Sequence, residues 1–526
     1  MSMLTGVTRR RLLQQASALA ALAFVPGCRE QSAVRLSKLA NYPFPLGVAS
    51  GDPITDGIVL WTRLAPDPFD PQAMPKAPVV VDWSLAEDEN MSRIVRRGQA
   101  FARHEHGHSV HVDVRGLKPG REYFYRFEAA GEASPVGRTR TLPIIGSPAE
   151  RLRFAFASCQ HYEQGYFRAY RDMVEQDVDL ILHLGDYIYE RLYDGEWPGG
   201  VRRHPHEEAF TLDQYRAYHA CYKLDPDLQE AHRLVPWAVT WDDHEVDNDY
   251  AGEHSEDLWD AERFLRRRAV AYKAYFEHMP LRRIAMPQGP DMRLYQRLTY
   301  GDLVEFNLLD TRQHRSDQAC PGPDNGAGSF VSPKDCPELA APERTMLGEA
   351  QEEWLAQGYG RTGAKWNVLA QAVLFAPVLQ GPPQESPRWS DIWDGYPAAR
   401  ARLLEVMKER KIANPVVLTG DIHSFWVNDV PSDPANPASP AAATELVCTS
   451  VTSPGVPYEL IAQTLPVNSH VKYFESRERG YVLCNVSHEA WRTSLRKVEN
   501  IRDPQSGSSL LKEFVIEAGK AGAQPV

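Results

Sequence analysis

Short apolar runs that each end in polar residues recur from residue 151 onward, and this pattern restricts the chain to a core built around buried strands. The runs lie at 152–159, 178–184, 237–241, 304–309, 366–371 and 415–419. Helical patterns occupy 166–176 and 257–278. Buried strands that alternate with helices are typical of an α/β domain, which we place at 150–526.

Residues 41–145 show a different pattern, in which alternating runs are interrupted by turn residues. The runs lie at 57–62, 79–83, 109–114 and 122–127. Strands of period two with Gly or Pro between them predict an all-β sandwich. The segment VRGLKPGREYFYRFEA at 114–129 resembles the corner and following strand of fibronectin type III modules, in which the tyrosine packs and hydrogen-bonds.

The first 30 residues have the character of a targeting segment. Arg9, Arg10 and Arg11 precede the apolar stretch 16–26, which is too short to span a bilayer. This arrangement resembles a twin-arginine leader, so the expected partner is the twin-arginine export machinery, and the expected location is periplasmic or secreted. Cys28 stands in a sequence that loosely resembles a lipoprotein cleavage box, which leaves lipidation and plain cleavage both open. We expect no integral membrane span.

Composition excludes several classes of function. Lys plus Arg at 58 against Asp plus Glu at 70 gives a net charge of -12, which disfavours nucleic acid as a stable partner. No CxxC pair, GxSxG elbow, P-loop or GxGxxG fingerprint occurs, which argues against zinc ribbons, serine hydrolases and nucleotide-dependent enzymes. Cys320 and Cys336 flank a Pro-rich loop and can be either bridged or free.

The decapeptide WDDHEVDNDY at 241–250 concentrates more carboxylates than a folded chain accommodates without compensation. Ligands of open α/β sheets lie at the carboxyl ends of the strands. Residues suited to metal binding follow several of the predicted strands, namely Cys159, Asp186, Asp243, Asp421 and His423. We therefore expect cations to neutralise the acidic cluster at one edge of the sheet.

Each of these residues also has a structural interpretation. An Asp that follows a Gly at a strand end is often a turn or helix-cap residue. A lone Cys159 would be a small buried side chain, and a lone His423 would be a hydrogen-bonded core histidine. Their order at successive strand ends favours a shared site over these separate interpretations.

Five motifs, FAFASCQ, HLGDYIYE, WDDHEVDN, LLDTRQHR and VLTGDIHSFW, together resemble the phosphodiesterase/alkaline phosphatase D (PhoD-like) family of metallophosphoesterases. The resemblance implies an α/β two-sheet sandwich with helices outside, preceded by the fibronectin III-like β domain. The sequence has Asp-Asp-His-Glu and Gly-Asp-x-His where that superfamily commonly has Gly-Asn-His-Glu and Gly-His-x-His. Exchanging imidazole for carboxylate ligands favours a hard cation such as calcium.

The same resemblance implies Fe3+ bound by Cys159, Asp186 and Tyr189, with one or two Ca2+ ions beside it and Asp186 as the bridge. The remaining implied ligands are Asp243, Asn248, Asp421 and His423. His244 either contacts the phosphate ester as a catalytic residue or orients a neighbouring carboxylate. Arg312 either contacts phosphate or pairs with an acidic neighbour.

We expect an exported, metal-dependent phosphoric ester hydrolase of the alkaline phosphatase D type. Its phosphate ester substrates would be cleaved by in-line attack of a metal-bound hydroxide, for phosphate acquisition. An enzyme alternative is a phospholipase D or extracellular nuclease that uses the same metal centre. A non-enzyme alternative is a carbohydrate- or surface-binding protein that uses the N-terminal module. The physiological substrate and the oligomeric state stay open at this point.

Overall fold

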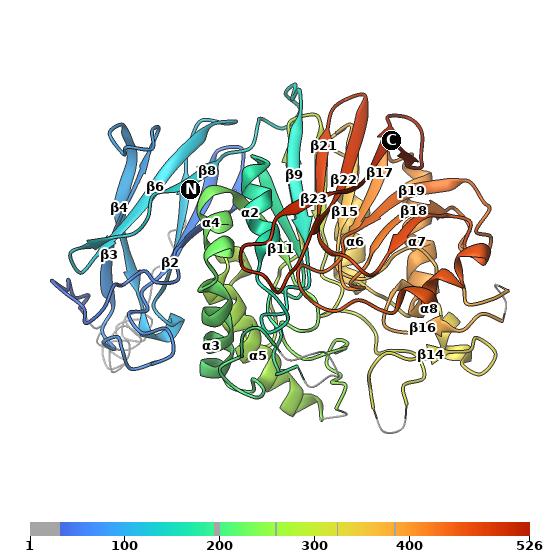
Figure 1. Cartoon of the computed structure of the whole chain (residues 1–526), viewed down its shortest axis with the longest axis horizontal. Helices are drawn as coiled ribbons and strands as arrows, with labels where there is room; N and C mark the ends of the chain where they lie inside the picture. The colour runs from blue at the N-terminus through green and yellow to red at the C-terminus, as the bar shows by residue number, and fades with distance from the viewer. Residues whose placement is uncertain (1–31, 194–199, 258–259, 323–324, 383–384) are drawn as a thin grey trace, which may run out of the picture.

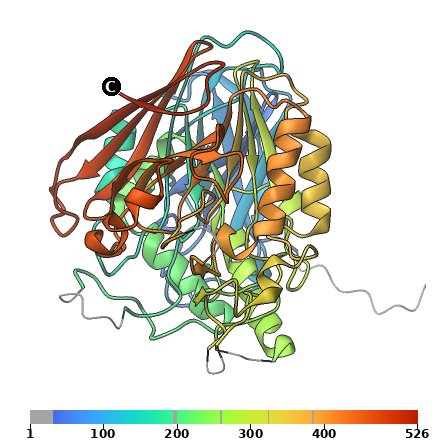
Figure 2. The ribbon, with the colours of Figure 1, turned by 90° about the vertical axis from the view of Figure 1, so that its right-hand side faces the viewer.

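The computed structural model describes residues 32–193, 200–257, 260–322, 325–382 and 385–526. Its centre is a pair of large sheets packed face to face, with helices on the outer surfaces (Figures 1 and 2). Side chains of both sheets interleave in one apolar core, where Phe154 of the first sheet meets Phe306 of the second with ring centroids 5.2 Å apart. The structure therefore has several sheets with helices outside them (Figure 1), and the specific sandwich predicted from the sequence is not confirmed.

The first sheet has ten strands and carries the N-terminal half of the candidate site. In spatial order these are β24 (Gln524–Pro525), β23 (Ser508–Glu517), β22 (Ala490–Val498), β21 (Arg479–Val486), β9 (Leu152–Ala157), β10 (Leu180–Leu184), β11 (Pro236–Thr240), β1 (Val48–Ile54), β2 (Gly57–Arg63) and β5 (Ser109–Arg115). The central strands β9, β10 and β11 are parallel. Both faces of these strands are buried, which explains their continuous apolar sequences.

The second sheet has seven strands. They are β12 (Gln296–Tyr300), β13 (Val304–Leu308), β15 (Trp366–Ala370), β17 (Pro415–Thr419), β19 (Ala441–Val447), β18 (Phe425–Pro431) and β20 (Val471–Glu475). Within this sheet, β13, β15, β17 and β19 pair consecutively with one another in parallel. Helices α6 (Glu349–Gly358) and α7 (Pro397–Glu409) cover its outer face (Figure 2).

The outer face of the first sheet is covered by α2 (Arg168–Glu175), α3 (Leu212–Lys223), α4 (Pro226–Leu234) and α5 (Ala261–His278). Local sequence sets where these helices begin. At the start of α3, the hydroxyl of Thr211 accepts a hydrogen bond from the backbone amide of Gln214 in a capping box. Asp225 caps α4 immediately before Pro226. Asp260 accepts the amide of Arg263 at the start of α5. A short helix, α8 (Tyr458–Ala462), follows β19.

The N-terminal region is β-rich, as predicted, but it shares a layer with the central core. Strands β1, β2 and β5 extend the ten-stranded sheet, because β1 pairs in parallel with β11. The facing sheet contains β4 (Ile94–Ala102), β3 (Val79–Ala86), β6 (Glu122–Ala129), β7 (Glu132–Ala133) and β8 (Gly137–Arg140). Tyr123 accepts a hydrogen bond from the amide of Lys118, 3.0 Å away. The description of this region as a fibronectin III-like domain is not confirmed.

The helical predictions 166–176 and 257–278 correspond to α2 and α5. Helices α3, α4, α6 and α7 and the strands after β17 were not predicted. No helix among the described residues has the length and apolar character needed to cross a membrane. The predicted leader at 1–30, including Cys28, lies outside the described residues.

Candidate metal centre

The carboxyl ends of parallel strands from both sheets meet at one edge of the core, as the sequence predicts. Cys159 and Asp186 follow β9 and β10, and the amide of Cys159 donates to the carbonyl of Gly185 at 3.1 Å. At the end of β11, the hydroxyl of Thr240 donates a hydrogen bond to the carbonyl of Leu309, which follows β13 of the second sheet, at 2.8 Å. This contact draws the two sets of strand ends together.

The candidate ligands at these strand ends have left-handed backbone conformations. Cys159, Asp186, Asp421 and His423 have φ of 59°, 55°, 59° and 50°, a region that non-glycine residues seldom adopt and that is common at functional sites. Gly185 makes one turn possible, since a Cβ there would lie 2.4 Å from the Cβ of Asp242. The glycine of the Gly-Asp motif is thus required by close packing.

One side of the centre combines a thiol, a carboxylate and an imidazole. Ligand atoms of Cys159, Asp186 and His423 lie within 4.8 Å of one another. The hydroxyl of Tyr189 is 2.9 Å from Asp186 Oδ2 and 3.1 Å from His423 Nε2. His423 Nδ1 donates to the carbonyl of Pro454 at 2.8 Å, so in the neutral ring Nε2 carries the lone pair that a metal needs.

The other side is formed by carboxylates and a second histidine. Ligand atoms of Asp186, Asp243 and His244 also lie within 4.8 Å of one another. Asp186 is therefore common to both groups, which is the position of a bridging ligand. His244 Nδ1 is 2.7 Å from the buried carboxylate of Glu190, so its Nε2 is the nitrogen left for the site.

Arg312 is fully buried at the base of the acidic cluster. Its guanidinium bonds Asp242 and lies 2.9 Å from Asp391 Oδ2, and the remaining nitrogen is 3.7 Å from Asp243 and 3.9 Å from Asp421. This placement favours the second of the two sequence interpretations, pairing with acidic neighbours. Arg315 also bonds Asp391.

Carboxylates outnumber these arginines. The acids around the site are the buried Asp186, Asp242, Asp243 and Asp391 and the partly buried Asp421, against the buried Arg312 and Arg315. Burial raises the pKa of Asp186 and of Asp421 well above the usual range, and it raises that of Asp242 to about 7. Asp186 Oδ1, Asp242 Oδ2 and Asp243 Oδ1 are buried and have no hydrogen-bond partner in the part of the chain that the structure describes. Oxygens in that state fit cation ligands, because an unsatisfied buried acceptor is otherwise costly.

Other acids of the decapeptide have structural roles. Glu245 accepts the amides of Asp186 and Asp242 at 3.1 and 2.8 Å, so it braces two strand-end turns, and burial raises its pKa to about 8. Asp247 pairs with Arg267 at 2.8 Å. The acids of this run therefore have different roles: Glu245 stabilises two turns, Asp247 forms an internal ion pair, and Asp243 faces the centre.

Asn248 lies beside the site, where two glutamates, Glu256 and Glu190, accept its hydrogen bonds. Its amide nitrogen Nδ2 donates to Glu256 at 2.7 Å, and its backbone amide donates to Glu190 at 3.2 Å. The side-chain oxygen Oδ1 is the atom that a cation would use. Its role as a ligand stays a prediction, as do the roles of the other ligands.

A third group, His161, Glu163 and His204, has ligand atoms within 4.8 Å of one another. Tyr222 accepts the amides of Tyr162 and Tyr189, so its own proton goes to His204 Nε2, 3.1 Å away. Nδ1 of the neutral His204 then carries a proton and faces Glu163 Oε2 at 3.6 Å. This pattern assigns the group to internal hydrogen bonding, because His204 has no lone pair directed at the carboxylate.

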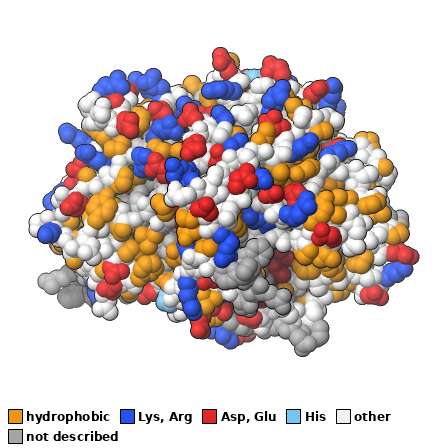
Figure 3. Space-filling view, in the orientation of Figure 1, with side chains coloured by type: hydrophobic (Ala, Val, Ile, Leu, Met, Phe, Trp, Pro, Cys, Tyr) orange, Lys and Arg blue, Asp and Glu red, His pale blue; other side chains and the backbone are white. Residues whose placement is uncertain are grey.

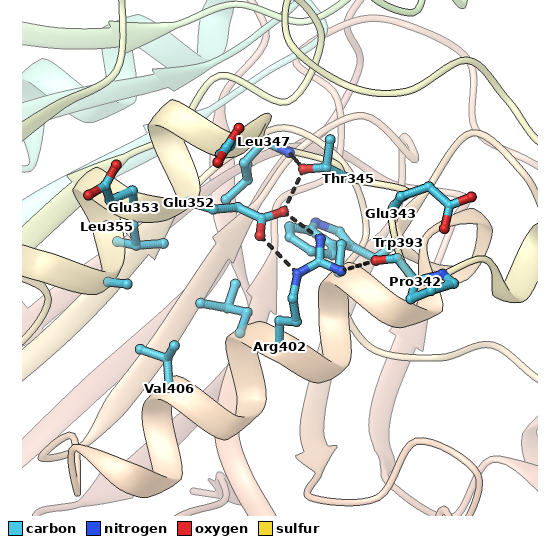
Figure 4. Close-up of a pocket in the computed structure, with 14 residues that line it drawn as sticks. Pro342, Glu343, Thr345, Leu347, Glu352, Glu353, Leu355, Trp393, Arg402 and Val406 are labelled. Atoms are coloured by element: carbon cyan, nitrogen blue, oxygen red, sulfur yellow. Dashed lines mark hydrogen bonds and ion pairs between the residues drawn. The ribbon is translucent and has the colours of Figure 1, made fainter.

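A cavity of about 530 Å³ lies elsewhere, between α6 and α7 (Figure 4). Leu347, Leu355 and Val406 line it, and Glu352 bonds Arg402 at its wall. None of the predicted site residues lines it.

The loop between Cys320 and Cys336 is closed by a disulfide, which resolves the alternative that the sequence left open.

Several residues of the site were not found from the sequence. Glu190 follows Tyr189 in the motif HLGDYIYE and could have been noticed as a partner for His244. Asp391, Ser453 and Arg479 come from loops or a strand start without any recognisable pattern. Their contribution depends on contacts between distant parts of the chain.

Comparison with known proteins assigns the chain. Residues 154–495 match the model of the PhoD-like phosphatase family, and residues 29–143 match the model of its N-terminal domain. Alkaline phosphatase D of Bacillus subtilis (strain 168) is 44% identical over 531 residues, covering 98% of this chain and 89% of that protein. A solved structure described as the structure of PhoD superposes with a TM-score of 0.88 at 44% identity, over 93% of both chains.

With this fold and this set of buried donors, the chain is a phosphoric ester hydrolase. More narrowly, it belongs to the PhoD-like phosphatase family. The family implies metal cofactors, and the thiol, imidazole and unpartnered carboxylate oxygens at the strand ends suit them.

Proposed function

We propose that this chain is an exported alkaline phosphatase and phosphodiesterase that releases phosphate for uptake. The observation that carries the proposal is Asp186, whose carboxylate lies beside Cys159 and His423 on one side and beside Asp243 on the other, where His244 also faces it. Two adjacent donor sets with one common carboxylate suit a pair of cations that bind a single phosphate ester.

The two donor sets differ in softness. Cys159, Tyr189, Asp186 and His423 combine sulfur, phenol, carboxylate and imidazole, which suits Fe3+. The opposite side offers the oxygens of Asp186, Asp243, Asn248 and Asp421, which suit one or two Ca2+ ions. When bound, the cations neutralise phosphate oxygens and lower the pKa of a coordinated water.

The residues of the chain itself hold the donors and move a proton. Arg312 fixes Asp242 and Asp391 and lies within 4 Å of Asp243 and Asp421, so it orients the carboxylates and limits their repulsion. The other alternative, direct contact with phosphate, falls to Nη2, which has no hydrogen-bond partner among the described residues.

His244 is positioned to donate a proton to the departing alcohol. Burial lowers the pKa of His244, but the carboxylates of Glu190, Asp243 and Asp186 outweigh this effect and hold the pKa well above the usual range. With cations bound at Asp186 and Asp243, Glu190 is the carboxylate that still favours the imidazolium, in which Nδ1–H is bound to Glu190 and Nε2–H faces the site as a donor and not as a metal ligand. A general acid of this kind contributes about 10²- to 10⁴-fold to the rate.

The surface and leader support the proposed location and substrate. On the face shown in Figure 3, acidic and basic side chains are intermixed instead of forming a basic stripe. Together with the net charge of -12, this favours small phosphate esters over duplex DNA. Export rests on Arg9 to Arg11, which resemble a twin-arginine signal.

The test uses the purified full-length chain and its variant Asp186→Ala. We expect wild-type protein to hydrolyse an aryl phosphate monoester and a diester at alkaline pH, to lose activity with a chelator, and to recover it with iron and calcium. Asp186→Ala should be at least about 10³-fold slower, because both donor sets lose a member. Turnover by the variant at the wild-type rate, or by chelated wild type, would exclude the proposed centre.

A further inference from the structure

A loop that follows β19, residues 450–455, contacts the softer donor set from behind. Ser453 Oγ is 2.6 Å from the hydroxyl of Tyr189 and 3.0 Å from the carbonyl of Cys159. The next residue, Pro454, accepts the Nδ1 proton of His423 at 2.8 Å. Two consecutive loop residues therefore contact three of the four residues in this donor set.

The contacts from Ser453 and Pro454 determine which way the donors face. The ring of Tyr189 lies between those of His161 and His244, with centroids 4.4 and 4.2 Å away. These two rings prevent the tyrosine ring from swinging toward either side. The Ser453 hydroxyl fixes the remaining freedom of that oxygen. The Pro454 carbonyl selects the His423 tautomer whose Nε2 faces the site.

Arg479 in turn fixes the loop. Its Nη1 donates to the carbonyl of Ser453 at 2.6 Å and to the hydroxyl of Ser450 at 2.9 Å, Nη2 bonds the carbonyl of Ser476, and Nε donates to the carbonyl of Glu478 at 2.9 Å. Arg479 is 7% exposed. Among the described residues it forms no ion pair with a carboxylate, although burial of an unpaired cation is costly.

Gly455 shows how closely the loop and the arginine pack. A Cβ at this position would lie 2.4 Å from the carbonyl oxygen of Ser476, 2.6 Å from Arg479 Nη2 and 2.7 Å from the carbonyl oxygen of His423. The loop thus passes between Arg479 and the strand end that carries His423, and only glycine fits there.

We propose that Ser453 and Arg479 are positioning residues of the metal centre: Arg479 holds the 450–455 loop, and the loop sets the orientation of Tyr189 and His423. The proposal rests on the proposed function, since it assigns these residues to the donor set named there. It predicts that removing either contact loosens the softer metal while the fold persists.

The test compares Ser453→Ala and Arg479→Gln with matched controls. Ser494→Ala removes a buried hydroxyl that bonds Glu513 on β23, at 2.8 Å. Arg63→Gln removes an arginine that is 8% exposed and whose Nε donates to the carbonyl of Gly107. Arg63 matches Arg479 further, because burial lowers the pKa of each to about 10.

The measurements are metal content by elemental analysis, the visible absorption band of the purified protein, and the rate at which a chelator removes the transition metal. Loss of an outer contact to a ligand typically costs about 10- to 100-fold in metal affinity. We expect Ser453→Ala and Arg479→Gln to release the metal about 10- to 100-fold faster than wild type and to shift the band. Both controls should behave as wild type.

The outcomes separate the two proposals. If wild type shows no metal-dependent hydrolysis, the proposed function fails. If wild type is active and Ser453→Ala retains the wild-type release rate and spectrum, the positioning role is wrong. Should Arg479→Gln not fold, Arg479→Lys is measured instead: one ammonium cannot reach all four acceptors, so intermediate release is expected, and wild-type release would overturn the role of Arg479.

Discussion

Replacing Arg312 with Gln separates its two possible roles. The guanidinium is fully buried, bonds Asp242, and lies 2.9 Å from Asp391. If it serves to compensate these carboxylates, its loss destabilises the folded chain whether or not substrate is present. If it binds phosphate directly, its loss mainly weakens turnover.

The expected size follows from the geometry. A pair of unit charges 2.9 Å apart interacts by about 6 kcal/mol at an effective dielectric constant near 20. Desolvation of the guanidinium offsets much of this, and removing one member of a buried pair costs about 3 to 5 kcal/mol. Unfolding entropy of about 2.1 cal/mol/K per residue gives about 1 kcal/mol/K for a chain of 526 residues. The thermal unfolding midpoint of Arg312→Gln should therefore fall by about 3 to 5 °C relative to wild type.

The assay is calorimetry of chelator-treated protein at pH 8, with calcium added in a second scan. Arg171→Gln is the control, because Arg171 is 53% exposed and pairs with Glu175 on the surface; a change under about 1 °C is expected there. Calcium should restore part of the loss in Arg312→Gln by neutralising the same carboxylates. An unchanged midpoint with a large fall in kcat/KM would refute the pairing role.

Three further outcomes are expected. Tyr189→Phe should remove or shift a visible iron(III)–tyrosinate band; an unchanged band would exclude Tyr189 as a ligand. His244→Gln should lower kcat by about 10²- to 10⁴-fold for an alkyl phosphate and much less for a nitrophenyl phosphate, whose leaving group needs little protonation; equal losses would contradict the general-acid role. Replacing Cys320 and Cys336 with Ser should destabilise their loop by about 3 kcal/mol in the chain-entropy model, seen as faster proteolysis between residues 320 and 336.

The parts of the site that could be predicted are those encoded locally. Cys159, Asp186, Asp243 and Asp421 each follow a buried strand, and parallel strands bring such ends to one edge whatever the rest of the chain does. Asp391, Ser453 and Arg479 could not be found in this way. They reach the centre through loops whose paths depend on tertiary contacts, and no short-range pattern marks them.

The fold shows the same division. Apolar runs indicated β9, β10 and β11, because strands buried on both faces have no polar alternation. The pairing of β1 with β11 was not foreseen, since it joins residues that are about 186 positions apart, Ser50 with Pro236. Period-two patterns identify strands but do not say which sheet a strand joins.

The order of strands in the ten-stranded sheet also bears on when the enzyme can assemble. Strand β9, which leads to Cys159, pairs on one side with β10 and on the other with β21, which begins at Arg479. Ribosomal synthesis therefore delivers the neighbour of β9, and the arginine that holds the 450–455 loop, only about 320 residues after Cys159. The centre therefore assembles well after β9 and β10 have been made, which fits the proposed export of the chain in its folded state.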